Sequence, residues 1–272
     1  MPAADGRHRI LLERCKMMER KERLFVSVIM PAYNAERYIR QAIESVQSQT
    51  CDQWELLVID DGSTDGTVGI VQAISEQDGR IHLIRNENNL GVARTRNVGL
   101  DAARGEMIAL LDSDDYWYPE KLEKQLRLAQ QTGADVIYCS YMMHYDDEKR
   151  PEKQYAVPST TDYDKMLTES VISCSTALIR MKAIGDQRFH SEYFHEDYVF
   201  WLELLRKGAK AVGCEEPLAV YRIVPESRSS NKWNSAKKRW LVYRSYLKLP
   251  LGKSMRCFAS YCLNGVKKYR KQ

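Results

Sequence analysis

The strongest candidate for metal chemistry in this chain is the acidic run Asp112-Ser113-Asp114-Asp115. It follows the apolar segment 107–111, which is typical of a buried strand. Carboxylates this close repel one another unless a cation or hydrogen-bond donors neutralise them. Mg²⁺ and Mn²⁺ take oxygen ligands and complete their shells with water or substrate phosphate. The alternative is a solvated acidic turn before a helix, and the run alone favours that alternative.

A second acidic turn, Asp60-Asp61-Gly62, follows the apolar segment 56–59. A carboxylate at this place is able to accept a hydrogen bond from the imide N–H of uracil, and the small residues that follow let a base approach. An ordinary strand-to-helix turn has the same composition. Both interpretations stay open at this point.

Charged residues also stand where two further helices are expected to begin. The segment 88–97 contains Gly91 followed by Arg94 and Arg96, and either arginine is a candidate to meet a diphosphate at a positive helix end. Glu196-Asp197 opens a later helix, where the helix dipole favours acids in any case. One of these two carboxylates is a candidate general base.

Short apolar runs alternate with helical patterns through the first half of the chain. This alternation predicts an α/β fold with a mostly parallel sheet and helices on both faces. In such sheets ligands bind beyond the carboxyl ends of the strands, so the polar clusters are expected to converge on one cleft. The expected strands are 26–30, 56–59, 81–84, 107–111, 136–139, 174–180 and 217–223. One helix is expected to begin at about residue 36, and a second helix, after the strand at 56–59, to end at about residue 74. Further helices are expected at 90–103, 119–131 and 195–207.

The charge distribution divides the chain. Its net charge is +4, yet the residues from 227 to 272 include 13 Lys/Arg and no Asp/Glu. We expect a charged leader at 1–23, a catalytic domain at 24–226 made of a nucleotide-binding half (24–115) and an acceptor half (116–226), and a basic helical tail at 227–272. No Pro/Gly-rich linker separates the two halves.

Helical spacing predicts that the end of the tail is amphipathic. It either lies on an anionic membrane surface, in which case truncation before about Lys253 leaves the catalytic domain folded, or packs its apolar face on that domain. Nucleic acid is not an expected partner, because no binding module is recognisable. The expected apolar face comprises Met255, Phe258, Ala259, Cys262, Leu263, Val266 and Tyr269.

Several classes of protein are not expected from the composition. No apolar run approaches the roughly 20 residues of a membrane span, and residues 1–23 contain no apolar stretch of a secretory signal. The seven cysteines are scattered without a C-x-x-C pair, which argues against a zinc site or a disulfide framework. We therefore expect reduced thiols and a cytoplasmic protein, with peripheral attachment to the inner membrane face as the alternative linked to the tail.

Five motifs together resemble a known family. VSVIMPAYNAERYI, VIDDGSTDGT, NNLGVARTRNVGL, LDSDDYW and HEDYVFWLELL occur in an order and spacing similar to those of the inverting family 2 glycosyltransferases with the GT-A fold. The resemblance covers about residues 24–223. The continuation YRIVPESRSSNKW is similar to bacterial cell-surface polysaccharide transferases of the teichuronic acid or lipopolysaccharide type.

The resemblance implies a Rossmann-like α/β domain that uses Mn²⁺ or Mg²⁺ to move a sugar from a UDP-sugar to a glycan or lipid-linked glycan. The sugar would be a hexose or an N-acetylhexosamine. Asp114 would bind the metal, and Asp197 would be the catalytic base. The implied nucleotide-sugar site comprises Pro31, Tyr33, Asp61, Arg94, Asp112 and Asp114, with Asp61 selecting uracil.

Two departures from the family pattern bear on this reading. Processive members carry Q-x-x-R-W and membrane spans, whereas Ala236 stands where the glutamine would precede Arg239-Trp240. We therefore expect one sugar per encounter. Some relatives place a metal-binding histidine in the loop at 223–226, which has none here. The alternatives are a non-catalytic nucleotide-sugar-binding protein and a sugar-1-phosphate nucleotidyltransferase, although PAYNAE is not the Gly-rich loop expected of the latter.

Overall fold

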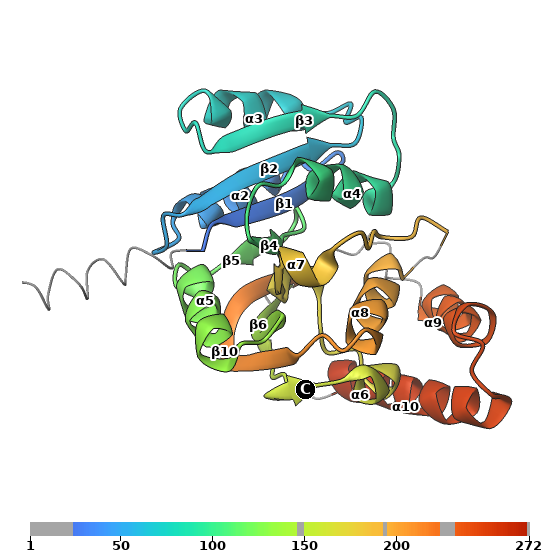
Figure 1. Ribbon diagram of the computed structural model, residues 1–272. Helices are drawn as coiled ribbons and strands as arrows, with labels where there is room; N and C mark the ends of the chain where they lie inside the picture. The colour runs from blue at the N-terminus through green and yellow to red at the C-terminus, as the bar shows by residue number, and fades with distance from the viewer. Residues whose placement is uncertain (1–23, 146–149, 193–194, 224–231, 271–272) are drawn as a thin grey trace, which may run out of the picture.

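The structure is a computed structural model that describes residues 24–145, 150–192, 195–223 and 232–270 (Figure 1), with the backbone alone described for 232 and 266–270. The expected leader at 1–23 and the domain boundary near 226 lie outside the described residues. One mixed sheet runs through both halves of the expected catalytic domain. The strands are β1 Val26–Ala32, β2 Trp54–Asp60, β3 Ile81–Arg85, β4 Met107–Leu110, β5 Tyr116–Trp117, β6 Val136–Tyr145, β7 Lys153–Tyr155, β8 Thr160–Thr161, β9 Leu178–Arg180 and β10 Ala211–Ile223.

The expected helices are present, with ends that differ by a few residues, and the short helices α6 and α7 were not expected. Glycine ends α5 as expected, since Gly133 takes the left-handed conformation at its C-cap. The helices are α2 Ile39–Gln47, α3 Thr67–Ser75, α4 Val92–Ala102, α5 Lys121–Thr132, α6 Tyr163–Thr168, α7 Met181–Ile184, α8 Glu196–Arg206, α9 Lys232–Leu241 and α10 Leu251–Arg270, with a 3₁₀ turn η1 Cys174–Thr176 and a π-helical turn η2 Val242–Tyr246.

The sheet has the strand order β3-β2-β1-β4-β9-β6-β10-β5, with β7 beside β6 and β8 beside β10. The ladders β3-β2, β2-β1, β1-β4 and β6-β10 are parallel. The antiparallel pairings are short, with at most three residue pairs each. The expected mostly parallel sheet is therefore confirmed, and the strands β1, β2 and β4 all end toward the same edge.

Helices cover both faces of the sheet. Apolar side chains of β1 alternate between two buried clusters, as the pleat of a strand requires. Val28 and Met30 belong to the cluster that α2, α3 and α5 complete, whereas Ile29 belongs to the cluster that α4, α6 and α8 complete. The predicted two-sided architecture is confirmed, and both clusters are needed to fix the edge where the polar turns stand.

The segment expected as one strand at 174–180 is instead a 3₁₀ turn followed by the short strand β9. The Thr176 hydroxyl donates to the Ser173 carbonyl at 2.8 Å and accepts the Ser173 N–H at 3.3 Å, which closes the turn. Such local side-chain bonds compete with the strand ladder. The turn places Ser175 beside the acidic run, where it takes part in the site.

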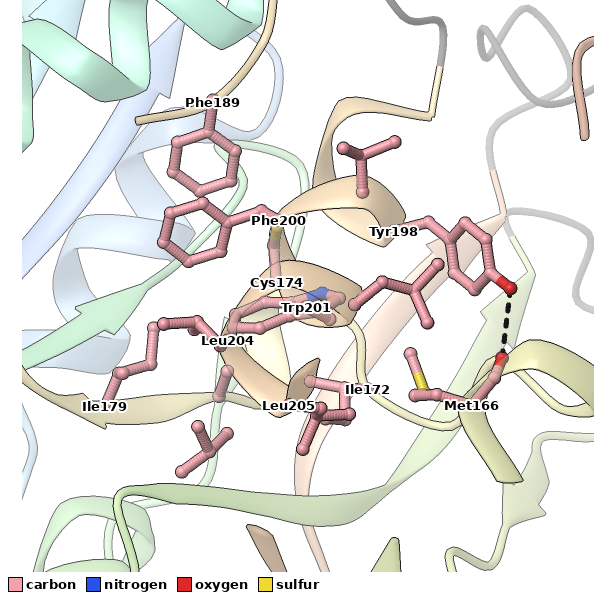
Figure 2. Close-up of a cluster of buried hydrophobic side chains, with 14 of the residues drawn as sticks. Met166, Ile172, Cys174, Ile179, Phe189, Tyr198, Phe200, Trp201, Leu204 and Leu205 are labelled. Carbon is pink, nitrogen blue, oxygen red and sulfur yellow. Dashed lines mark hydrogen bonds between the residues drawn. The ribbon is translucent and has the colours of Figure 1, made fainter. Parts of the chain in front are cut away.

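The tail packs on the catalytic domain at the end of the sheet opposite β3, beside α6 and α8 (Figure 1). Helix α8 is densely apolar on more than one side: Phe200 stacks on Phe189 with ring centroids 4.1 Å apart, and on another side Tyr198 donates to the Met166 carbonyl at 3.1 Å (Figure 2). Val242 and Tyr243 of η2 and Cys257 of α10 are buried in the same cluster.

Only part of the apolar face expected for the tail docks on the domain. Cys257 is buried and Phe258 packs edge-on against Trp240, with ring centroids 5.4 Å apart. Met255 and Leu263, however, are 55% and 63% exposed. The helix is apolar on more than one side, so that one side docks on the domain and another faces solvent. The side chains of 266–270 lie outside the described part of the tail.

Candidate active site

A cleft of about 860 Å³ opens at the carboxyl ends of β1, β2 and β4. The beginning of α8 also lines it, so residues from both halves of the expected catalytic domain meet in the cleft. The convergence expected from the strand ends is present in the structure. Of the residues proposed from sequence, Pro31, Tyr33, Asp61, Asp112, Asp114 and Asp197 line the cleft, and Arg94 is not among its lining residues.

The lining of the cleft includes an exposed aromatic ring and a buried carboxylate. Tyr33 is 52% exposed and available for stacking, since the turn after β1 keeps it outside the core. Asp61 is buried, and its oxygens accept hydrogen bonds from the backbone N–H groups of Leu90 and Gly91, at 2.8 and 2.9 Å, and from the Asn86 amide at 2.8 Å. Asp61 therefore fixes the loop before α4, and a carboxylate still has acceptor capacity for a further donor.

The acidic run forms a compact loop in which the three carboxylates have different surroundings. Asp115 is buried, and its oxygens accept from the Ser175 hydroxyl at 2.5 Å and the Arg222 N–H at 2.9 Å. Burial and the charges of Asp114 and Asp112 raise the pKa of Asp115. Asp112 and Asp114 instead face the cleft. The buried member anchors the loop, and the other two present oxygen atoms.

Arg222 secures the same loop from β10. Its Nε donates to the Asp114 carbonyl at 2.9 Å and its terminal nitrogen to the Gln41 side chain at 2.6 Å. The guanidinium also lies over the rings of Tyr38 and Tyr116, at 4.6 and 5.7 Å from their centroids. Arg222 therefore ties the acidic loop to α2.

The donor set at the acidic loop fits a hard divalent cation that is shared with a substrate. Burial and the neighbouring charge of Asp112 raise the pKa of Asp114 to about 6, so the loop holds negative charge that a cation would neutralise. Within the described residues no three His, Cys, Asp or Glu side chains form a complete metal site. Oxygen ligands in this number suit Mg²⁺ or Mn²⁺, which take phosphate oxygens and water for the rest of the shell.

Arg96, not Arg94, is the arginine that α4 turns into the site. Arg96 is 4% exposed and lines the cleft, where it donates to Asp112 at 2.7 Å and to Glu196 at 3.0 Å. Arg94 is on the exposed side of the helix. The sequence offered both arginines as candidates, and a contact of Arg94 with the donor stays a prediction.

Glu196 and Asp197 have separate roles at the beginning of α8. Glu196 is buried and accepts the hydrogen bond from Arg96, which links α8 to the acidic loop through Asp112. Asp197 faces the cleft, and its Oδ1 accepts the Tyr198 N–H at 2.7 Å. Of the two, Asp197 has the more accessible carboxylate, as a base that meets a substrate hydroxyl requires.

His195 also lines the cleft and was not singled out from the sequence. Its Nε2 donates to the Ser235 carbonyl of α9 at 3.0 Å, since a carbonyl only accepts. Burial and the charge of Arg239 lower the pKa of His195 to about 4, so the ring is neutral at neutral pH. The position of His195 directly before Glu196-Asp197 was the one sign in the sequence that it belongs to the site. Its hydrogen-bond partner, Ser235, lies 40 positions away and could not be inferred from the local sequence.

Comparison with known proteins decides the family. The model of glycosyl transferase family 2 matches residues 27–187, more than half of the chain. This chain belongs to glycosyl transferase family 2. The match contains the turns after β1 and β2, the loop before α4 and the acidic loop. The resemblance found in the motifs is thereby confirmed, and the chain is a glycosyltransferase.

Curated relatives extend the match over nearly the whole chain. TuaG of Bacillus subtilis, named for teichuronic acid biosynthesis, is 41% identical over 243 residues, which span 89% of this chain and 96% of TuaG. WfgD of Escherichia coli, named as a UDP-Glc:α-D-GlcNAc-diphosphoundecaprenol β-1,3-glucosyltransferase, is 35% identical over 246 residues, or 90% of this chain and 94% of WfgD.

The fold agrees with a solved structure. TarS of Staphylococcus aureus, in a crystal structure of residues 1–349 with UDP-GlcNAc, superimposes with a TM-score of 0.70 at 22% identity, covering 90% of this chain and 73% of that one. The likeness confirms the GT-A type of α/β fold. No helix in the described ranges combines the length and apolar character that a membrane crossing needs.

Proposed function

We propose that this glycosyltransferase moves a hexose or N-acetylhexosamine from a UDP-sugar to a glycan or lipid-linked glycan, with inversion at the anomeric carbon and with Mn²⁺ or Mg²⁺. The observation that carries the proposal is the single cleft in which Tyr33 and Asp61, the acidic loop and Asp197 meet. Together these side chains offer contacts for a base, a diphosphate and an acceptor hydroxyl. TarS was solved with UDP-GlcNAc and WfgD is named for UDP-Glc, which supports a uridine donor.

Each residue then has a distinct task. The Tyr33 ring stacks on the uracil, and Asp61 accepts its imide N–H. Asp112 lies toward the ribose, and Asp114 holds the cation, which stabilises the charge of the departing diphosphate when it is bound. Asp197 accepts the proton of the acceptor hydroxyl while that oxygen forms its bond to C1 and the C1–phosphate bond breaks to release UDP. Because the chain lacks the complete Q-x-x-R-W, one sugar is transferred per encounter.

The relatives support a role in surface polysaccharide assembly. TuaG is named for teichuronic acid biosynthesis, and the name of WfgD specifies an acceptor on diphosphoundecaprenol. The chain matches nearly the full length of both relatives. We therefore place this chain with enzymes that extend a lipid-linked glycan at the cytoplasmic face of the membrane.

Donor binding provides the first test. Titration of UDP into the protein should show tight binding with Mn²⁺ and weak binding in excess chelator. Asp114→Asn should lose the metal-dependent part, since the amide carries no charge for the cation. Asp186→Asn, an exposed carboxylate outside the cleft, is the matched control and should bind as the wild type does. Equal UDP affinity with and without metal would refute the metal assignment.

The solvent-facing side of the tail supports attachment to an anionic membrane. Trp233, Leu241, Leu251, Met255 and Leu263 are exposed, Trp233 by 87%, in a segment that carries only basic charges. Apolar side chains that insert at the interface and lysines or arginines near anionic lipid both contribute to such binding. The docked side of the tail leaves this side free to do so.

Sedimentation with phosphatidylglycerol vesicles tests the attachment. The protein should bind at low salt and less at high salt, because salt screens the charges and leaves the apolar contribution. Replacement of Leu251, Met255 and Leu263 by serine should weaken binding without loss of fold, since all three side chains are exposed. Tyr118→Ser, an exposed aromatic on the β5–α5 connection, is the control. Equal sedimentation of the triple variant and the wild type would contradict the attachment.

A further inference from the structure

The inner face of α9 contacts the two residues that flank Glu196-Asp197. The Ser235 carbonyl accepts the hydrogen bond of His195, and the guanidinium of Arg239 lies 3.3 Å from the ring centroid of Tyr198. Ser235 and Arg239 are four residues apart, so they occupy the same face of α9. The residues on either side of Glu196-Asp197 are thus both held by one face of α9.

Arg239 is buried between two aromatic rings. It is 4% exposed, with Tyr198 of α8 on one side and Tyr261 of α10, at 4.8 Å, on the other. Its Nε is buried without a hydrogen-bond partner. Contacts with the two rings, and a hydrogen bond with the Tyr198 side chain, hold the guanidinium in place.

The Tyr198 ring is held at its edge as well as on its face. Its hydroxyl donates to the Met166 carbonyl at 3.1 Å (Figure 2), while the neighbouring Tyr243 donates to the Leu167 carbonyl at 2.7 Å. Tyr198 is the residue after Asp197, and its N–H is the donor to Asp197 Oδ1. A displacement of the Tyr198 ring therefore moves the N–H that orients the carboxylate of the candidate base.

We infer that Arg239 is a positioning residue for Asp197. It presses the Tyr198 ring onto α6 and so fixes the first turn of α8, with the Asp197 carboxylate directed into the cleft. Arg239 does not line the cleft, so it acts through α8 and not on the donor. The inference rests on the proposed role of Asp197 as the base, and it extends the active site to the C-terminal tail.

The test compares Arg239→Met with Lys237→Met in the full chain. Methionine keeps much of the buried volume of Arg239 and removes the cation, whereas Lys237 carries the same charge on the exposed side of α9. UDP release from UDP-glucose and UDP-N-acetylglucosamine, with Mn²⁺ and with water as acceptor, gives kcat and KM. Hydrogen exchange of the peptide spanning 195–199 reports the order of the first turn without any substrate.

In Arg239→Met, kcat should fall about 10- to 100-fold, the range that a displaced catalytic group produces. KM and UDP affinity should be unchanged, and exchange should be faster in 195–199. Arg239→Lys, which keeps the charge, should recover part of kcat. Tyr261→Leu removes one of the two rings and keeps the buried cation, and it should also lower kcat. It replaces Arg239→Met as the test if Arg239→Met does not fold.

Turnover of Arg239→Met equal to that of Lys237→Met would overturn the inference. A parallel loss of UDP affinity and of global protection would also overturn it, since it would show a purely structural role. Failure of the proposed function is a separate result: Asp197→Asn would turn over normally, or the wild type would release no UDP, while the exchange of 195–199 would still report what Arg239 does to α8.

Discussion

At the scale of single residues, Arg96 joins the two sides of the active site. It is the cation between Asp112 of the acidic loop and Glu196 of α8, and both ion pairs are largely buried. Removing one partner of a buried pair leaves an uncompensated charge, which costs about 3–5 kcal/mol. Surface arginines away from such pairs change stability by less than about 0.5 kcal/mol.

Arg96→Met should therefore lower the free energy of unfolding by about 3–5 kcal/mol, and Arg94→Met should leave it nearly unchanged. Urea denaturation of the two variants measures this. Arg94→Met also tests the contact predicted from sequence, since loss of a phosphate contact would raise KM for the donor without a change in stability. Similar stability losses in both variants would contradict the bridging role of Arg96.

His195 provides a prediction on pH. Burial and the charge of Arg239, with a smaller contribution from Lys238, lower its folded pKa to about 4, although Asp197 acts in the opposite direction. Below the unfolded pKa of about 6.5, the unfolded chain binds a proton that the folded chain refuses. The stability that neutral His195 permits is therefore present above pH 6.5 and is lost as the pH falls toward 4.

His195→Gln should lose less stability than the wild type between pH 6.5 and pH 4, by up to about 3 kcal/mol. The glutamine amide still donates to the Ser235 carbonyl and does not titrate. Urea denaturation at pH 7.5, 5.5 and 4.5 measures the difference. Parallel loss of stability in both proteins over this range would show that His195 does not titrate as its burial requires.

At the scale of elements, the close approach of α4 to the sheet sets the position of Arg96. A Cβ added at Gly99 would lie 2.4 Å from Ile29 Cγ2 and 2.9 Å from Ile59 Cδ1. Gly99 therefore lets α4 lie directly on β1 and β2. Any larger residue at this position pushes α4, and Arg96 with it, away from the acidic loop.

Gly99→Ala should cost about 1–3 kcal/mol through overpacking and should weaken UDP binding. Gly69→Ala is the matched control, since a Cβ at that exposed position in α3 meets nothing within 4 Å. It should stabilise the protein by about 0.5–1 kcal/mol, because alanine is the better helix former. If the two substitutions had the same effect on unfolding and on UDP affinity, the role of Gly99 would be refuted.

The strands that were predicted from the sequence are long enough to show a regular apolar pattern. β1, β2 and β6 are buried along most of their length, and apolar runs indicated each of them. The two- and three-residue strands β5, β7 and β8 were not predicted, because they are too short to show a period and exist through pairing with β6 and β10.

The site was predictable wherever a residue stands at a strand end. Asp61, Asp112 and Asp114 converge because parallel strands end together, which topology alone requires. The choice between Arg94 and Arg96 depends on which side of α4 packs inward, and both had been candidates. Asp115 meets Ser175 and Arg222 across 60 and 107 positions, and no local pattern reveals such contacts.

At the scale of the whole molecule, the tail is part of the folded domain. Cys257 and Ser254 are buried, Phe258 packs on Trp240, and Tyr261 covers Arg239. Truncation before about Lys253 was expected to leave the catalytic domain folded if the tail served the membrane alone. The structure favours packing. Removal of α10 would expose apolar side chains whose burial stabilises the fold by about 1–3 kcal/mol each, whereas the free energy of unfolding of a whole domain is only about 5–15 kcal/mol.

A chain ending at residue 250 should therefore melt at a markedly lower temperature than the full chain, or fail to fold. Thermal denaturation followed by circular dichroism measures this. The triple serine variant of Leu251, Met255 and Leu263 controls for loss of the exposed side alone, and it should melt close to the wild type. An unchanged melting temperature in the truncated chain would show that α10 contributes nothing to the fold.

The proposed function requires that one cleft performs metal-dependent transfer from a UDP-sugar with Asp197 as the base. Its most direct test is UDP release from a panel of UDP-sugars by the wild type, Asp114→Asn and Asp197→Asn, with Mn²⁺ and with chelator. Of these combinations, only the wild type with Mn²⁺ should release UDP, and it should do so from at least one of the sugars. Asp197→Asn should bind UDP with unchanged affinity but should not release it from a UDP-sugar. Full release in chelator would rule out the metal requirement, and normal release by Asp197→Asn would rule out Asp197 as the base.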